Sequence, residues 1–163
     1  ELSRRLNGDN AYSVMYFDLN HFKEYNDTYG FSNGDKMIKL ASTIIKDAVE
    51  KCGEVTDFAG HIGGDDFVCV CNQMADVPIA REVVERFEAE KLQLFNEIDR
   101  KAGSMLAKDR EGQACQIPLT GMAIAILRCD PSKIGNPAEL AREAAEVKHE
   151  VKQMDKSTYL VRE

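Results

Sequence analysis

The sequence lacks several features that mark out whole classes of protein. No apolar run approaches the length of a membrane-spanning helix, and no apolar stretch follows the charged N-terminus, as a signal peptide would require. The 5 cysteines are odd in number and include no Cys-x-x-Cys pair. We therefore expect reduced thiols in a cytoplasmic protein, without a zinc site. The sequence also contains no internal repeat and no low-complexity segment.

Positive charge is also scarce. The 21 Lys and Arg residues face 28 Asp and Glu residues, which gives a net charge of −7. This balance disfavours nonspecific binding to nucleic acid, although a nucleotide could still be held by a metal ion and a few focused lysines. The 163 residues, 44% hydrophobic and 30% charged, suit one soluble globular domain with a real core. We expect a single domain over residues 1–163, without membrane contact of its own.

The pattern of apolar residues predicts strands and helices in a mixed order. Residues 1–10 are expected to be helical in their first half and to start without a cap, which suggests a domain excised from a longer protein whose missing parts could tether it to a membrane. Further along, we expect a central strand at 12–17, a helix at 20–29, a loop at 31–35, a helix that begins at Asp35 and is ended by Gly53, and a hairpin at 57–70. In the second half, we expect a helix from an Asp76 N-cap to about 98, a loop at 101–116, a strand at 117–127, a helix from a cap at Asn136 to about 153, and a closing strand at 158–161. This order predicts an α/β (α+β) fold, with a mixed sheet of about five strands flanked by helices.

A diglycine turn sits in the middle of the hairpin. Gly63 and Gly64 separate two runs of β-formers, and glycine reaches the positive φ values that tight hairpin turns need. Asp65 and Asp66 follow at once, and two adjacent carboxylates repel each other unless a cation compensates them. Taken alone, the segment is more typical of a plain solvated turn.

A second acidic position lies upstream. Asp18 ends the first buried strand, and the edge where such strands end is where ligands bind in open α/β sheets. If that strand lies beside the hairpin, Asp18, the Leu19 carbonyl and Asp65 form an oxygen-only site of the kind that Mg²⁺ prefers. Lys148 and Lys152 are one helical turn apart and could share one polyphosphate, with Lys23 joining them. A solvated helix face is the alternative for the two lysines.

Two blocks of the sequence resemble the GGDEF domain of diguanylate cyclases. They are Asp18-Leu19-Asn20-His21-Phe22-Lys23-x-x-Asn26-Asp27-x-x-Gly30-x-x-x-Gly34-Asp35 and Gly63-Gly64-Asp65-Asp66-Phe67. The helix with Lys148 and Lys152 is similar to the phosphate-binding helix of that family. The polar segment before Pro118 resembles the subgroup in which this domain follows an EAL domain and CBS repeats.

The resemblance implies a ferredoxin-like palm fold, as in nucleotidyl cyclases, and the condensation of two GTP molecules into cyclic di-GMP with release of two pyrophosphates across a homodimer. Regulatory or sensor domains in the same chain are implied as well. The resemblance also implies that Asp18, the Leu19 carbonyl and Asp65 bind the metal ions, Mg²⁺ or Mn²⁺, and that Asp65 and Asp66 are catalytic. The implied substrate-binding residues are Asn26 and Asp35 on the guanine edge, Gly63 and Gly64 beside the nucleotide, Lys148 and Lys152 on the terminal phosphates, and Phe22 and Lys23.

The chain departs from the family pattern at three positions. Asp66 replaces the usual glutamate, which shortens the carboxylate by one methylene group, and His61 stands where arginine is frequent. The product-inhibition motif Arg-x-x-Asp reads Glu54-Val55-Thr56-Asp57, so its cationic member has the wrong sign. We therefore expect no feedback inhibition there. Two functions remain open: an active diguanylate cyclase, or a GTP-binding module that regulates an attached domain without turnover. A plain ferredoxin-like interaction domain would have no affinity for GTP.

Overall fold

The computed structural model describes residues 11–108, 112–130 and 137–163. Its elements are β1 (Tyr12–Leu19), α2 (Phe22–Tyr29), α3 (Phe31–Cys52), β2 (Phe58–Gly63), β3 (Asp66–Asn72), α4 (Gln73–Glu90), a 3₁₀ turn (Lys91–Leu94), α5 (Glu97–Ala102), β4 (Ser104–Lys108), β5 (Ala114–Pro118), β6 (Met122–Cys129), α6 (Pro137–Lys152) and β7 (Thr158–Arg162). The expected helix within residues 1–10 and the expected cap at Asn136 lie outside the described residues. In that described part, no helix is long and apolar enough to cross a membrane.

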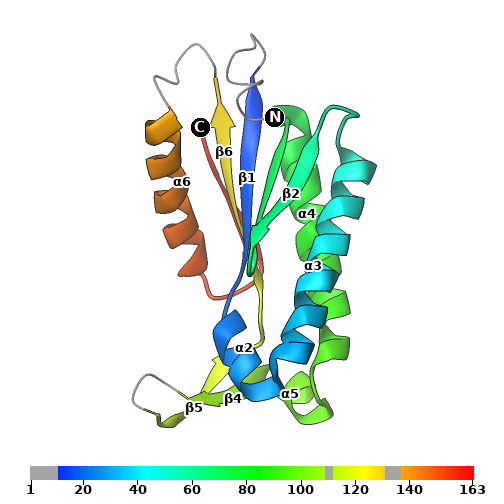
Figure 1. Ribbon diagram of the computed structural model, residues 1–163, viewed down its shortest axis with the longest axis vertical. Coiled ribbons are helices and arrows are strands. Elements are labelled where there is room, and N and C mark those ends of the chain that lie inside the picture. Colours follow the sequence, from blue (N-terminus) through cyan, green and yellow to red (C-terminus); the bar gives the residue numbers. More distant parts are fainter. Residues whose placement is uncertain (1–10, 109–111, 131–136) are drawn as a thin grey trace.

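A five-stranded sheet in the order β2-β3-β1-β6-β7 forms the centre of the fold, and β4 and β5 form a separate two-stranded ribbon. The sheet is mixed, because β6 and β7 are parallel while the other neighbours are antiparallel. Helix α6 covers one face and helices α3 and α4 cover the other, while α2, α5 and the ribbon lie together at one end (Figure 1). The predicted fold class and the pairing of the first strand with the hairpin are confirmed.

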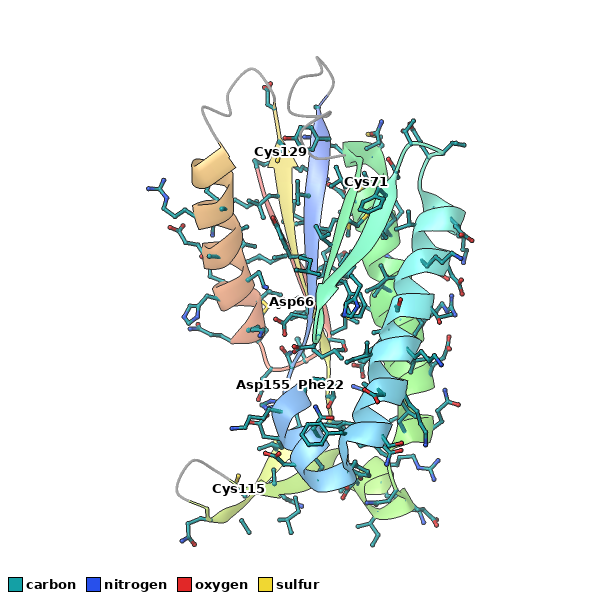
Figure 2. All side chains as sticks on the ribbon, in the orientation of Figure 1. Phe22, Asp66, Cys71, Cys115, Cys129 and Asp155 are labelled. Atoms are coloured by element: carbon teal, nitrogen blue, oxygen red, sulfur yellow. The ribbon has the colours of Figure 1, made fainter. Side chains whose placement is uncertain are left out.

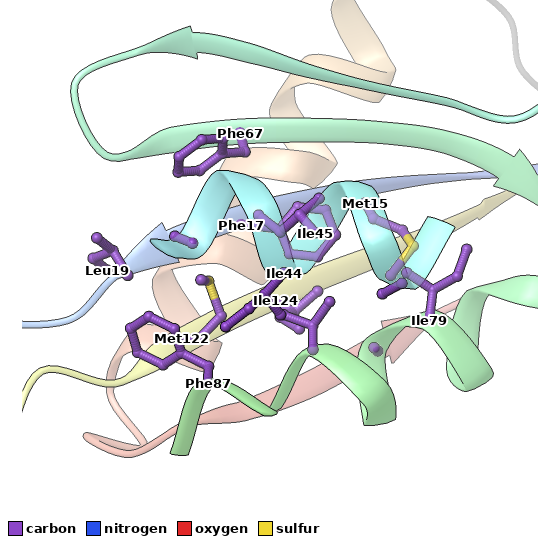
Figure 3. Packing of buried hydrophobic residues seen from close by; sticks show 14 of the residues in the cluster. Met15, Phe17, Leu19, Ile44, Ile45, Phe67, Ile79, Phe87, Met122 and Ile124 are labelled. Carbon is purple, nitrogen blue, oxygen red and sulfur yellow. The ribbon is translucent and has the colours of Figure 1, made fainter. Parts of the chain in front are cut away.

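Alternation along β1 divides the core between the two faces of the sheet. Met15, Phe17 and Leu19 pack in the cluster under α3 and α4 (Figure 3). Tyr12 and Val14 pack in the second cluster with Val147 of α6. Because successive strand residues point to opposite faces, residue 18 must project toward α6.

The predicted start of the long helix was wrong. Helix α4 begins at Gln73, and the side chain of Asn72 caps it by accepting a hydrogen bond from the Met74 amide at 2.9 Å. Asp76 is fully buried and binds Arg128 at 2.9 Å and the Ser13 hydroxyl at 2.7 Å. An aspartate before a proline is typical of a cap, but here tertiary ion pairing determines its place.

Three further expectations are corrected. Residues 31–35 are the first turn of α3, since Gly30 with φ +83° separates it from α2 without a loop. The long helix ends at Glu90 and is followed by the 3₁₀ turn, and Ile98 is 78% exposed on α5 rather than buried. The polar segment 101–116 contains β4 and most of β5, so the strand expected at 117–127 is divided between β5 and β6. The ribbon buries only one of its sides, Met105 and Ala107, while Leu106 is exposed, which explains its polar composition.

Candidate functional site

Two carboxylates face α6 from adjacent strands. The antiparallel register of β1 and β3 pairs Phe17 with Phe67. One step further along this register brings Asp18 opposite Asp66, and both lie on the α6 face by alternation. Asp18 is only 5% exposed, so folding has removed nearly all of its water. Two acids facing each other in this setting require positive charge nearby.

Helix α6 supplies that charge. Lys148 Nζ lies 2.6 Å from Asp66 Oδ1 and 3.8 Å from Asp18 Oδ2, so this ammonium group lies between the two carboxylates. Lys152, one turn later, lies 2.7 Å from Asp18 Oδ2. The same helix buries Ala144, Val147 and Val151 against the sheet, which fixes the lysines on the side of the site. Lys148 also lies 5.9 Å from the centre of the Tyr16 ring.

The electrostatics of Asp18 are those of a desolvated acid. Burial raises the pKa of Asp18 above its ordinary value, and the neighbouring Asp65 carboxylate adds to this rise, while Lys152 and Lys148 oppose it. Its Oδ1 atom is buried and has no hydrogen-bond partner among the described residues. A buried oxygen with spare acceptor capacity is well suited to a cation.

The diglycine turn has the backbone that the sequence predicted. Gly63 and Gly64 have φ values of +154° and +60°, which residues with a side chain rarely adopt. A register irregularity follows His61, whose ring stacks on Phe67 and makes a 2.8 Å hydrogen bond to the Gly64 carbonyl. The ring thus holds the turn closed, and the turn carries Asp65 close enough to influence Asp18.

A second part of the candidate site lies between α2 and α3. A Cβ atom on Gly34 would lie 1.8 Å from Asn26 Oδ1, so the Asn26 side chain rests directly on this glycine. Asn26 Oδ1 is buried without a hydrogen-bond partner in the described part of the chain. Asp35, the next residue on α3, is exposed. An amide that rests on Gly34 and a carboxylate at the next position of α3 offer the donor and acceptor types that a guanine edge requires.

The remaining predicted residues differ in their surroundings. Phe22 is half-buried and packs on the main core cluster, so it has a structural role as well. Lys23 is exposed on α2, and within the described residues it makes no ion pair with Asp18 or Asp66. The Leu19 side chain is buried in the core, and its backbone ends β1.

The degenerate inhibition motif is part of the fold. Asp57 Oδ2 accepts a hydrogen bond from the Glu54 amide at 2.8 Å, and Asp57 Oδ1 accepts one from the Asn72 amide at 3.1 Å. The Glu54 carboxylate accepts a hydrogen bond from the Asn72 side chain at 3.3 Å. Asp57 thus ties the turn before β2 to the end of β3.

The predicted metal site consists of oxygen atoms alone. Among the described residues, no three His, Cys, Asp or Glu side chains gather in a way that could hold a metal ion. The predicted set has two side chains, Asp18 and Asp65, and one backbone carbonyl, and would complete its shell with water and phosphate oxygens. The unpartnered Asp18 Oδ1 and the all-oxygen chemistry fit such an ion.

Two residues in this region form a contact that the sequence did not predict, although His21 stands in the motif quoted above. His21 and Asp155 form a hydrogen bond across the molecule, between the start of α2 and the turn after α6. Neither residue has a local pattern that signals the contact, because it depends on tertiary structure alone. Gly34 stood in the motif, but only its contact with Asn26 shows why a glycine is needed.

A mixed sheet with acids at one strand end, a diglycine turn and lysines on the covering helix defines an α+β domain whose opposite charges meet at one end of the sheet. The sequence matches the family described as "Diguanylate cyclase, GGDEF domain" over residues 1–156. The chain therefore belongs to the GGDEF domain family.

Relatives and solved structures agree with this membership. The chain is 31% identical over 87 residues to diguanylate cyclase DosC of Escherichia coli, which is 52% of this chain but 18% of that protein. It is 34% identical over 74 residues to diguanylate cyclase A of Treponema denticola, 45% of this chain and 19% of that protein. The fold matches the active GGEEF domain of a diguanylate cyclase from Vibrio cholerae, with a TM-score of 0.68 and 16% identity over 99% of this chain and 88% of that one. It also matches the GGDEF domain of TpbB from Pseudomonas aeruginosa, with a TM-score of 0.66 and 20% identity over 99% and 85% of the two chains.

Proposed function

We propose that the domain is a diguanylate cyclase, which condenses two GTP molecules into cyclic di-GMP and releases two pyrophosphates across a dimer of domains. The observation that carries this proposal is the cluster of Asp18, Asp66, Lys148 and Lys152, in which a nearly inaccessible acid lies 2.7 Å from a lysine on the covering helix. Family membership and the diguanylate cyclases among the relatives support the same activity.

Each residue has a defined part in this proposal. Asp18, the Leu19 carbonyl and Asp65 would hold Mg²⁺ or Mn²⁺, which neutralises phosphate charge and polarises the attacked phosphorus when it is bound. Lys148 and Lys152 would exchange their carboxylate partners for the terminal phosphates, a small rearrangement because their side chains are 29% and 45% exposed.

The nucleotide base has its own binding residues in the proposal. Asp35 would accept hydrogen bonds from the N1 and N2 donors of guanine, and Asn26 would supply the complementary contact. Gly63 and Gly64 would let the backbone approach the nucleotide, with Phe22 and Lys23 at its edge.

Asp66 would assist the 3′-hydroxyl group that attacks the α-phosphorus. Each domain binds one GTP, so the two attacking groups come from two copies of the chain. The dimer is therefore a requirement of the chemistry.

One observation favours a second function, a GTP-binding regulatory module without turnover. The Asp66 carboxylate is one methylene group shorter than the usual glutamate, and Lys148 binds it at 2.6 Å. A shift of about 1 Å in a catalytic group can lower a rate on the order of a hundredfold.

Incubation with GTP and Mg²⁺ at high protein concentration, followed by chromatography, distinguishes the two functions. A cyclic di-GMP peak supports the cyclase, and GTP binding without product supports the regulator. No GTP binding at any concentration would contradict both. High concentration is essential, because a monomer cannot complete the reaction.

A further inference from the structure

The turn between α6 and β7 is tied to the end of β1. The Asn20 side-chain amide donates to the Lys156 carbonyl at 3.4 Å. The imidazole Nε2 of His21 is hydrogen-bonded to the Asp155 carboxylate. Since an ionised carboxylate only accepts, the imidazole N–H is the donor. Two consecutive residues after β1 thus hold the segment that follows α6.

The same turn is held from its other side. The Met122 amide at the start of β6 donates to Ser157 Oγ at 2.8 Å, and Ser157 Oγ donates to Glu88 on α4. A Cβ atom on Gly121 would lie 2.8 Å from the Ser157 amide nitrogen, so the chain passes very close to β6 here. The turn after α6 is therefore held in place from both sides, and it fixes the position of the end of α6.

His21 and Asp155 share an unusual backbone conformation. Their φ values are +58° and +53°, and in the described part of the chain they are the only residues other than glycine with positive φ. His and Asp tolerate this region better than most residues, but still at a cost. The side-chain contact therefore joins two backbone positions that both adopt the left-handed conformation.

The pair joins the two segments that carry the phosphate cluster. His21 is three residues after Asp18, and Asp155 is three residues after Lys152. In the view of Figure 2, the labels of Asp155 and Phe22 stand at one level, below that of Asp66. The same two segments are therefore joined twice, by the contact of Lys152 with Asp18 at 2.7 Å and by the contact of His21 with Asp155.

We propose that His21 and Asp155 are positioning residues that hold the last turn of α6, and with it Lys152 and Lys148, where the terminal phosphates of GTP bind. This inference rests on the proposed function, since the phosphates are those of the nucleotide. The hydrophobic contacts of Val147 and Val151 keep the helix docked without the pair. Its removal should therefore loosen the lysines without unfolding the domain.

The substitution Asp155→Gly tests the side chain alone, because glycine adopts a φ of +53° freely. Binding of a non-hydrolysable GTP analogue and of GMP, both with Mg²⁺, is measured by calorimetry. We expect the dissociation constant of the GTP analogue to rise about tenfold, because charge-assisted contacts to phosphate are weakened. The dissociation constant of GMP, which lacks the terminal phosphates, should change less than twofold. Asp155→Asn is the matched control: it tolerates the same backbone, keeps an acceptor for His21, and should bind both ligands as the wild type does.

His21→Asn provides a second route to the same contact. Asparagine tolerates a left-handed backbone but is too short to reach Asp155, so it should also weaken only the GTP analogue. The double variant should lose no more affinity than either single variant, since both remove one interaction.

Equal affinity of Asp155→Gly and wild type for the GTP analogue would overturn the inference and leave the proposed function intact. An equal loss of GTP and GMP binding together with a lower melting temperature would also overturn it, since that is a purely structural effect. A wild-type domain that binds no GTP analogue would overturn the proposed function and this inference with it.

Discussion

Lys152 Nζ lies 2.7 Å from Asp18 Oδ2, so the end of α6 neutralises an acid on the central strand of the sheet. Asp18 is 5% exposed and Lys152 is partly exposed, which makes the pair unequal. Lys152 can turn to water or to a phosphate at little cost, while Asp18 has no other environment available. The carboxylate is therefore the fixed member and the lysine the exchangeable one.

Because Asp18 is buried and Lys152 is partly exposed, we predict that Asp18→Asn stabilises the metal-free domain and abolishes GTP binding. Burial raises the pKa of Asp18, so folding disfavours its charged form. Replacing it should therefore raise the unfolding free energy and the melting temperature at pH 7.5, because the neutral amide removes the cost of burying the charge while the partly exposed Lys152 can turn to water. Mg²⁺-dependent GTP binding should be lost. Thermal melts in EDTA and calorimetry with GTP measure the two effects.

The gain in unfolding free energy of Asp18→Asn depends on pH, because the pKa of Asp18 is raised in the folded state. The cost of the charged carboxylate is present above the folded-state pKa and disappears as the pH falls toward the ordinary carboxyl value. The stability advantage of Asp18→Asn should therefore shrink as the pH is lowered. A gain that grows on acidification would show that the carboxylate stabilises the fold.

The Asp66→Glu substitution is expected to raise the cyclase rate. The longer side chain restores the family's usual reach toward the attacking hydroxyl, and we expect an increase in kcat on the order of tenfold or more, with KM for GTP nearly unchanged. Steady-state release of pyrophosphate measures both constants. Asp66→Asn is the inactive control, and a slower Asp66→Glu enzyme would show that the shorter acid already fits this site.

Gly34→Ala should separate nucleotide recognition from folding. The new methyl group would lie 1.8 Å from Asn26 Oδ1, so the amide must turn away. Gly34 lies in the first turn of α3, and the atoms that the methyl group meets belong to the end of one side chain, so the fold should not be weakened. We expect the affinity for GTP to fall about tenfold, the effect of one lost polar contact to the base. Ser42→Ala, on the exposed side of the same helix, is the control. Unchanged affinity in Gly34→Ala would remove Asn26 from the site.

Asp57 is expected to matter for stability and not for regulation. Its carboxylate accepts hydrogen bonds from the Glu54 and Asn72 amides, so Asp57→Ala should cost roughly 1–3 kcal/mol of unfolding free energy. Chemical denaturation measures this loss. Added cyclic di-GMP should not inhibit the wild-type domain, because Glu54 repels its phosphates. A tight product complex that involves Asp57 would contradict this prediction.

The sequence was most informative where local chemistry and tertiary structure agree. The apolar run of β1 and the diglycine turn predicted the pairing of β1 with β3. The prediction brought Asp65 to Asp18, whereas the register places Asp66 opposite Asp18 and leaves Asp65 on the turn. The sequence misled where a local signal was overruled: Asp76 resembled a helix cap, but Arg128 and Ser13 bind it in the interior. The contact of His21 with Asp155 had no signal at all, since it joins distant segments through side chains.

The most direct test of the central claim, that Asp18 and Asp65 share a divalent cation carrying GTP, is a crystal structure of the domain with Mn²⁺ and a non-hydrolysable GTP analogue, with the metal located by anomalous scattering. We predict a manganese peak bound by both carboxylates and the Leu19 carbonyl, with Lys148 and Lys152 moved onto the terminal phosphates. A bound nucleotide with the metal elsewhere, and with both lysines still on Asp18 and Asp66, would contradict the account.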